Sequence, residues 1–150
     1  MASKKTSREA SPDNSAEIAR LRECRDEHRE EARKADRMAD DAKRAMDDAK
    51  ATAVQAKAEA KAASTEQGKV QRRFRASKAP DGSRVRNDLR REWDKANGAK
   101  RAAEDRQRAA ERTAETKRGA LSDAIHFAKG SRKEADKCEA EIRKLSKGRK

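Results

Sequence analysis

The residues best suited to chemistry are nine lysines and arginines gathered between positions 69 and 91. Only two acidic residues, Asp81 and Asp88, share this stretch, so its formal charge is +7. Most of the nine are arginines, whose planar guanidinium binds phosphate oxygens in pairs. Such a cluster favours contact with a nucleic-acid backbone, although an acidic protein or an anionic membrane would use the same residues. We name this group the basic tip: Lys69, Arg72, Arg73, Arg75, Lys78, Arg84, Arg86, Arg90 and Arg91.

A second basic run ends the sequence. Residues 143–150 carry five cations and no acid, and the other segments are nearly neutral, so the two clusters hold most of the net charge of +13. We expect both clusters to contact a polyanion without reading base sequence, because the chain contains no DNA-reading motif. The C-terminal candidates are Arg143, Lys144, Lys147, Arg149 and Lys150.

The residue pattern gives little support to catalysis or to cofactor and metal binding. The sequence has no P-loop, no dinucleotide fingerprint and no H-E-x-x-H motif. Ser122, Asp123 and His126 are close in sequence, but an exposed helix offers no oxyanion hole. We therefore expect a non-enzymatic protein without cofactor or metal. Cys24 and Cys138 have no metal-ligand spacing, and free thiols are the preferred interpretation, with a disulfide as the alternative.

The composition limits the fold that could position these residues. Of 150 residues, 33% are hydrophobic and 46% are charged, which is typical of long charged helices or of disordered chains. Apolar residues, mostly Ala, recur at alternating steps of three and four from Ile18 to Phe74 and again from Leu89 to Leu145. Three polar residues interrupt the first series: Arg25, His28 and Gln67. A period sustained over this length favours helix over disorder.

The segment Ala79-Pro80-Asp81-Gly82 predicts a turn between the two periodic stretches, and Ser83 can cap the helix that follows. Folding the chain back there makes Phe74 face Leu89 and Val70 face Trp93. We expect an all-α fold, a long antiparallel two-helix coiled-coil hairpin with an Ala-rich seam, about 90 Å long. Because Asn14 and Glu17 have the spacing of a capping box, the first helix is expected to start near Ser15. The predicted organisation is a disordered tail over 1–14, helices over 15–78 and 84–146, a turn at 79–83 and a basic tail at 147–150.

Two alternatives remain open at this point. An Ala-rich seam could instead form a continuous or parallel oligomeric coiled coil. Apolar residues beyond the seam form a candidate surface for a partner or for self-association: Met38, Leu121, Ile125 and Phe127. The second hypothesis for function is therefore a structural or assembly protein, a scaffold, stalk or adaptor related to phage or secretion.

In outline the expected hairpin resembles the tRNA-binding arm of seryl-tRNA synthetases and the small stalk proteins of flagellar and type III export. No residue motif accompanies this likeness, so it assigns no residue a role. The sequence has no apolar run of membrane-spanning length and no apolar segment near its N-terminus. We expect a cytoplasmic protein, with nucleoid or virion association as a further option.

Overall fold

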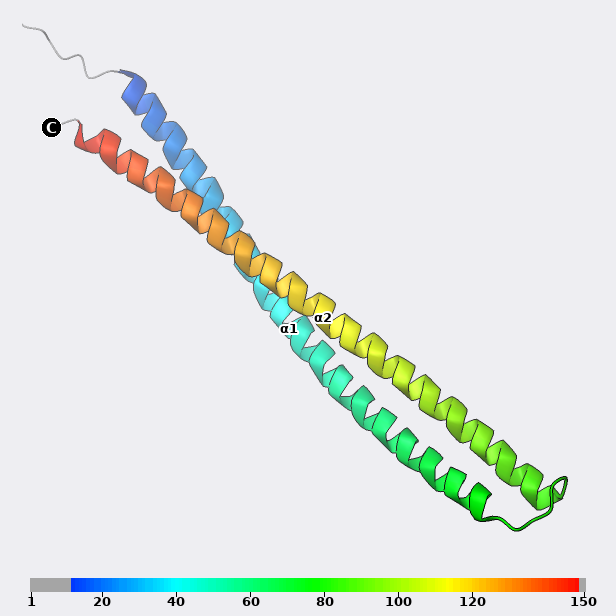
Figure 1. Ribbon diagram of the computed structural model, residues 1–150. Helices are drawn as coiled ribbons and strands as arrows, with labels where there is room; N and C mark the ends of the chain where they lie inside the picture. The colour runs from blue at the N-terminus through cyan, green and yellow to red at the C-terminus, as the bar shows by residue number, and fades with distance from the viewer. Residues whose placement is uncertain (1–11, 149–150) are drawn as a thin grey trace, which may run out of the picture. The chain divides into compact units, whose positions relative to one another are not determined.

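Two long helices make up the part of the chain that the structure describes. A computed structural model describes residues 12–148 and contains no strand within that range (Figure 1). Helix α1 spans Pro12–Ala76, 65 residues, and helix α2 spans Arg84–Lys147, 64 residues. The predicted all-α helical hairpin is confirmed. The loop of residues 77–83 breaks the helix, so the alternative of one continuous helix is wrong.

The two helices contribute to two packed units. The loop unit is Ala42–Gly119, and the terminal unit contains the described residues up to Asp41 and from Ala120 onward. In each unit a stretch of α1 pairs with a stretch of α2. Arg25 bonds to Glu139 in the terminal unit and Gln67 bonds to Asn97 in the loop unit, which makes the pairing antiparallel. Both pairs lie within one residue of the register that the sequence predicts.

Burial follows the predicted seam. Every seam position of α1 from Ile18 to Phe74 is buried or half-buried, and so is every seam position of α2 from Leu89 to Leu145 except Lys117. Alanine fills most of the fully buried positions, including Ala35, Ala103 and Ala128. Because Ala has a short side chain, each layer removes little apolar area from water. The helices are therefore held by many small contributions along the seam.

The helix boundaries differ slightly from the prediction. Helix α1 begins at Pro12, three residues before the expected start, so Asn14 lies inside the helix and the proposed capping box is wrong. Proline suits a first helical turn because its missing N–H would have no partner there. Residues 1–11 of the predicted tail lie outside the described residues. At the other end α1 stops at Ala76, two residues early, where the chain approaches Pro80, and α2 ends at Lys147.

No helix in the described range is long and apolar enough to cross a membrane.

Candidate functional site

The loop that joins the helices positions the basic tip. Gly82 has a positive φ of 81°, as the third residue of a type II turn requires, and the Ser83 N–H donates to the Pro80 carbonyl at 3.1 Å. Ser83 then caps α2, because its Oγ accepts a hydrogen bond from the Arg86 backbone N–H at 3.2 Å. The predicted turn and cap are both confirmed. They set the end of α1 and the start of α2 next to each other.

The Arg86 side chain connects the start of α2 to the end of α1. Its guanidinium lies 4.1 Å from the centre of the Phe74 ring, and its Nη1 donates to the carbonyls of Phe74 and Ser77 at 3.0 and 3.2 Å. Its Nε lies 3.6 Å from Asp81. The side chain is only 24% exposed. Arg86 therefore binds one carbonyl in the last turn of α1 and one just beyond it, a role that sequence reasoning missed when it grouped Arg86 with the candidate phosphate contacts.

Phe74 and Trp93 form an apolar contact between the two helices beside Arg86, and we name this pair the aromatic lock. Their ring centroids are 5.0 Å apart, whereas the sequence predicts that Val70 faces Trp93 and that Phe74 faces Leu89. The difference follows from side-chain direction. Helical side chains lean toward the N-terminus of their own helix, so in an antiparallel pair Phe74 and Trp93 lean toward each other. The Trp93 indole N–H is buried and has no hydrogen-bond acceptor within the described residues.

The other eight cations of the basic tip are exposed to solvent. Arg73 lies 3.8 Å from Glu92, and Arg91 lies 3.9 Å from Asp88, but these long pairs between exposed side chains hold the guanidinium groups only weakly. Six cations make no ion pair or side-chain hydrogen bond within the described residues: Lys69, Arg72, Arg75, Lys78, Arg84 and Arg90. These six are free to bind an external anion.

Spacing along the helices groups the exposed cations. Lys69, Arg72 and Arg75 follow each other at three-residue intervals, so they are neighbours on the surface of the last turns of α1. Arg84 and Arg91 are seven residues apart and share one side of the first turns of α2. Both helices thus present cations on either side of the same short loop. This arrangement offers several phosphate contacts to one extended polyanion.

The C-terminal candidates within the described residues are less available than the exposed cations of the basic tip. Arg143 lies 3.8 Å from Glu139, and Lys144 donates to Glu141 at 3.0 Å. Lys147 is exposed at the end of α2. Arg149 and Lys150 lie outside the described residues. Ion pairing within the chain therefore occupies two of the three C-terminal candidates that the structure describes.

The predicted partner surface lies in the terminal unit. Met38 and Phe127 are 64% and 59% exposed, which is high for large apolar side chains. Ile125 is 41% exposed, while Leu121 is half-buried and belongs to the seam. Ile125 and Phe127 are two residues apart and therefore lie on opposite sides of α2, so the three exposed apolar residues flank the seam without forming one continuous patch. His28, Ser131 and Glu134 line the same open groove as Phe127.

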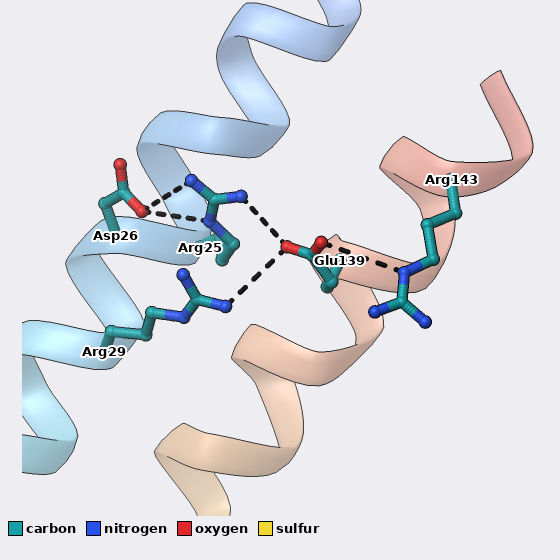
Figure 2. Close-up of polar contacts among 5 residues, drawn as sticks. All are labelled: Arg25, Asp26, Arg29, Glu139 and Arg143. Atoms are coloured by element: carbon teal, nitrogen blue, oxygen red, sulfur yellow. Dashed lines mark hydrogen bonds and ion pairs between the residues drawn. The ribbon is translucent and has the colours of Figure 1, made fainter. Parts of the chain in front are cut away.

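An ion-pair network in the terminal unit is a feature that the sequence did not identify. Figure 2 shows Arg25, Arg29 and Arg143 converging on the carboxylate of Glu139. The strongest contact is the 2.9 Å hydrogen bond from Arg25 Nη1 to Glu139 Oε2. This bond is the main reason why the pKa of Glu139 is lowered and the pKa of Arg25 is raised. The sequence signal for this network is Arg25, because a charged residue at a seam position needs a partner on the facing helix.

No group of three or more His, Cys, Asp or Glu side chains in the described range could hold a metal ion. Ser122, Asp123 and His126 are all exposed on α2. No protein-family model, curated protein or solved structure matches the chain.

Proposed function

We propose that this chain is a non-enzymatic helical hairpin that binds the sugar–phosphate backbone of nucleic acid through its basic tip. The observation that carries the proposal is the set of six exposed cations with no internal partner, gathered on both sides of one loop. Unpaired cations such as Arg44 and Arg101 also occur elsewhere in the described range, but they lie among acidic residues, whereas only two acidic residues lie between positions 69 and 91. A cation without an internal partner loses no interaction within the chain when it binds a phosphate.

The physical driving force would be counterion release. Each neutralised phosphate of duplex DNA contributes about −0.9 to the slope of log affinity against log salt. Six contacts would therefore weaken binding by roughly a thousandfold between about 50 and 200 mM salt. Arginine supplies four of the six cations, and its fork matches two phosphate oxygens at once. Such contacts position a protein on the backbone and carry no base specificity.

Arg86 has a separate role in this proposal. Its guanidinium is engaged with Phe74, Ser77 and Asp81, so it supports the site and does not contact the phosphate. Lys147, Arg149 and Lys150 remain proposed secondary contacts. Arg143 and Lys144 would have to leave Glu139 and Glu141 first.

The test is fluorescence anisotropy of the full chain with labelled DNA and RNA of mixed sequence, single-stranded and duplex, over a range of salt. The key variant replaces Arg72, Arg75, Arg84 and Arg90 with Gln. Its matched control replaces Arg44, Arg101, Arg106 and Arg112, four exposed arginines of the loop unit that also make no ion pair. Both variants remove four positive charges from the same unit.

We expect the tip variant to lose affinity steeply and to flatten the salt slope by about 3 to 4, since four contacts disappear. The control should keep most of its affinity, because only the position of the charges differs. Equal losses in the two variants would mean that net charge alone drives binding. Absence of binding by the unmodified chain at low salt would refute the proposal outright.

A second function has its own observation in its favour. The exposed side chains of Met38 and Phe127 suit a structural or assembly protein that binds another helix through the terminal unit, and Ile125 is exposed on the other side of α2. Sedimentation of the unmodified chain and of a Met38→Ser, Phe127→Ser variant would test it. A concentration-dependent assembly that the double variant loses supports this function, and a monomer at all concentrations that captures no protein partner argues against it.

A further inference from the structure

The two cysteines of the chain meet across the terminal unit although 114 positions separate them in sequence. Cys24 belongs to α1 and is half-buried, and Cys138 belongs to α2 and is buried. Their Sγ atoms are 3.6 Å apart, within hydrogen-bonding distance for two sulfur atoms. A disulfide bond is about 2.05 Å long, so the sulfur atoms need to approach by roughly 1.5 Å to bond.

The neighbouring contacts hold the two thiols in register. Arg25 follows Cys24 and Glu139 follows Cys138, and these two residues share the 2.9 Å hydrogen bond of Figure 2. Cys138 is also a seam residue, in line with the buried side chains of Ala135 and Ile142. Packing on one side and an ion pair on the other therefore keep the sulfurs in contact. Such preorganisation raises the effective concentration of one thiol at the other.

We propose that Cys24 and Cys138 form a reversible intramolecular disulfide by exchange with a low-molecular-weight disulfide. In the first step the Cys24 thiol gives up its proton and its sulfur attacks one sulfur of the small disulfide. That S–S bond breaks, a mixed disulfide forms at Cys24, and one small thiolate leaves and takes up a proton. In the second step the deprotonated Cys138 attacks the Cys24 sulfur and releases the second small thiol. Overall, two protein thiols are oxidised and one small disulfide is reduced to two thiols.

Exposure sets the order of the two steps. Cys24 is the more accessible sulfur, so it meets the reagent first, and the buried Cys138 resolves the mixed disulfide. The pKa of Cys24 is raised, chiefly by its hydrogen bond with Cys138 and further by burial and by Glu27 of α1 and Glu134 of α2. Since the thiolate is the attacking species, the exchange should be slow at neutral pH and accelerate as the pH rises. The product would tie α1 to α2 covalently.

The experiment treats the reduced full chain with glutathione disulfide, quenches with an alkylating reagent at intervals, and measures intact mass. The Cys138→Ser variant should accumulate the mixed disulfide at Cys24, and Cys24→Ser should react slowly. The matched control is the double variant Cys138→Ser, Ala140→Cys, which keeps two thiols but moves one to an exposed position two residues away on α2. Circular dichroism confirms that each variant remains helical.

We expect the unmodified chain to close to a monomeric disulfide at least about tenfold faster than the matched control. Closure of both at the same rate would show that proximity in the folded terminal unit contributes nothing. A reaction of the unmodified chain that stops at the mixed disulfide, or that yields mainly disulfide-linked dimers, would also overturn the proposal. Loss of the rate advantage in concentrated urea would tie the closure to the folded pair of helices.

Discussion

At the scale of single residues, Glu139 is a carboxylate of the terminal unit that contacts arginines from both helices. Three arginines approach it, and Arg25 is the nearest. Its folded-state pKa is lower than the unfolded value of about 4.3. The stabilisation is therefore fully present above that unfolded value and is lost as the pH falls through the folded pKa. Acid should loosen the terminal unit by protonating this group.

We expect the thermal midpoint of the unmodified chain to fall more steeply below about pH 4.5 than that of Glu139→Gln, which is already less stable at neutral pH. Circular dichroism at a series of pH values measures both. Glu134, whose pKa is also lowered, by a hydrogen bond from Lys137, titrates in both proteins, so the difference isolates Glu139. Glu141→Gln is the control, because Glu141 pairs with Lys144 of its own helix. Parallel pH curves for all three proteins would contradict the assignment.

The sequence predicts where the cations of the candidate site lie but not which of them have partners within the chain. The excess of cations between 69 and 91 is visible from the order of residues alone. Which of these cations have a partner within the chain depends on distances between side chains. Arg86 donates a hydrogen bond to the Phe74 carbonyl of α1, and Arg91 lies near Asp88. The partners of charged residues beside the seam depend on distances in the same way, because long side chains can turn. Arg29 pairs with Glu139, and Arg132 pairs with Asp36.

At the scale of elements, the loop depends on one glycine. Gly82 has a φ of 81°, a left-handed conformation that costs a residue with a Cβ about 1–2 kcal/mol. Gly82→Ala should therefore destabilise the loop unit by about that amount in urea unfolding. Gly98→Ala is the matched control in α2, with open space around the added methyl group. It should stabilise by up to about 1 kcal/mol, because Ala favours helix more than Gly does.

If Gly82→Ala proves neutral, the turn does not need the left-handed residue and the loop can rearrange at no cost.

The turn and the seam could be predicted from the sequence because their signals are local. Proline, glycine and serine act through local backbone geometry, and the alternating three-and-four spacing acts through helical periodicity. The starting point of α1 could not be predicted as well. Both Pro12 and Asn14 are plausible helix starts, and only the structure distinguishes between them.

At the scale of the whole chain, stability should vary with the size of the buried side chains. The seam from Ala49 to Ala63 is built from alanines, whereas Val70, Phe74 and Trp93 fill it near the loop. In the terminal unit, Ile18 and Ile142 are buried. Because apolar stabilisation scales with buried area, the Ala-rich stretch should open more often than the stretch next to the loop. Amide hydrogen exchange should accordingly be faster over residues 49–63 than over residues 67–74.

A pair of valines on α1 tests this uneven stability directly. Val70 is 4% exposed and Val54 is 71% exposed, and both belong to the loop unit. Val70→Ala removes buried methyl groups and leaves a cavity, at a cost of about 1–3 kcal/mol, so amide exchange near the loop should accelerate about tenfold or more. Val54→Ala removes the same methyl groups from a solvent-exposed side chain and should change amide hydrogen exchange little. Equal effects of the two substitutions, or uniform exchange along α1 in the unmodified chain, would mean that the alanine seam is as strong as the aromatic lock.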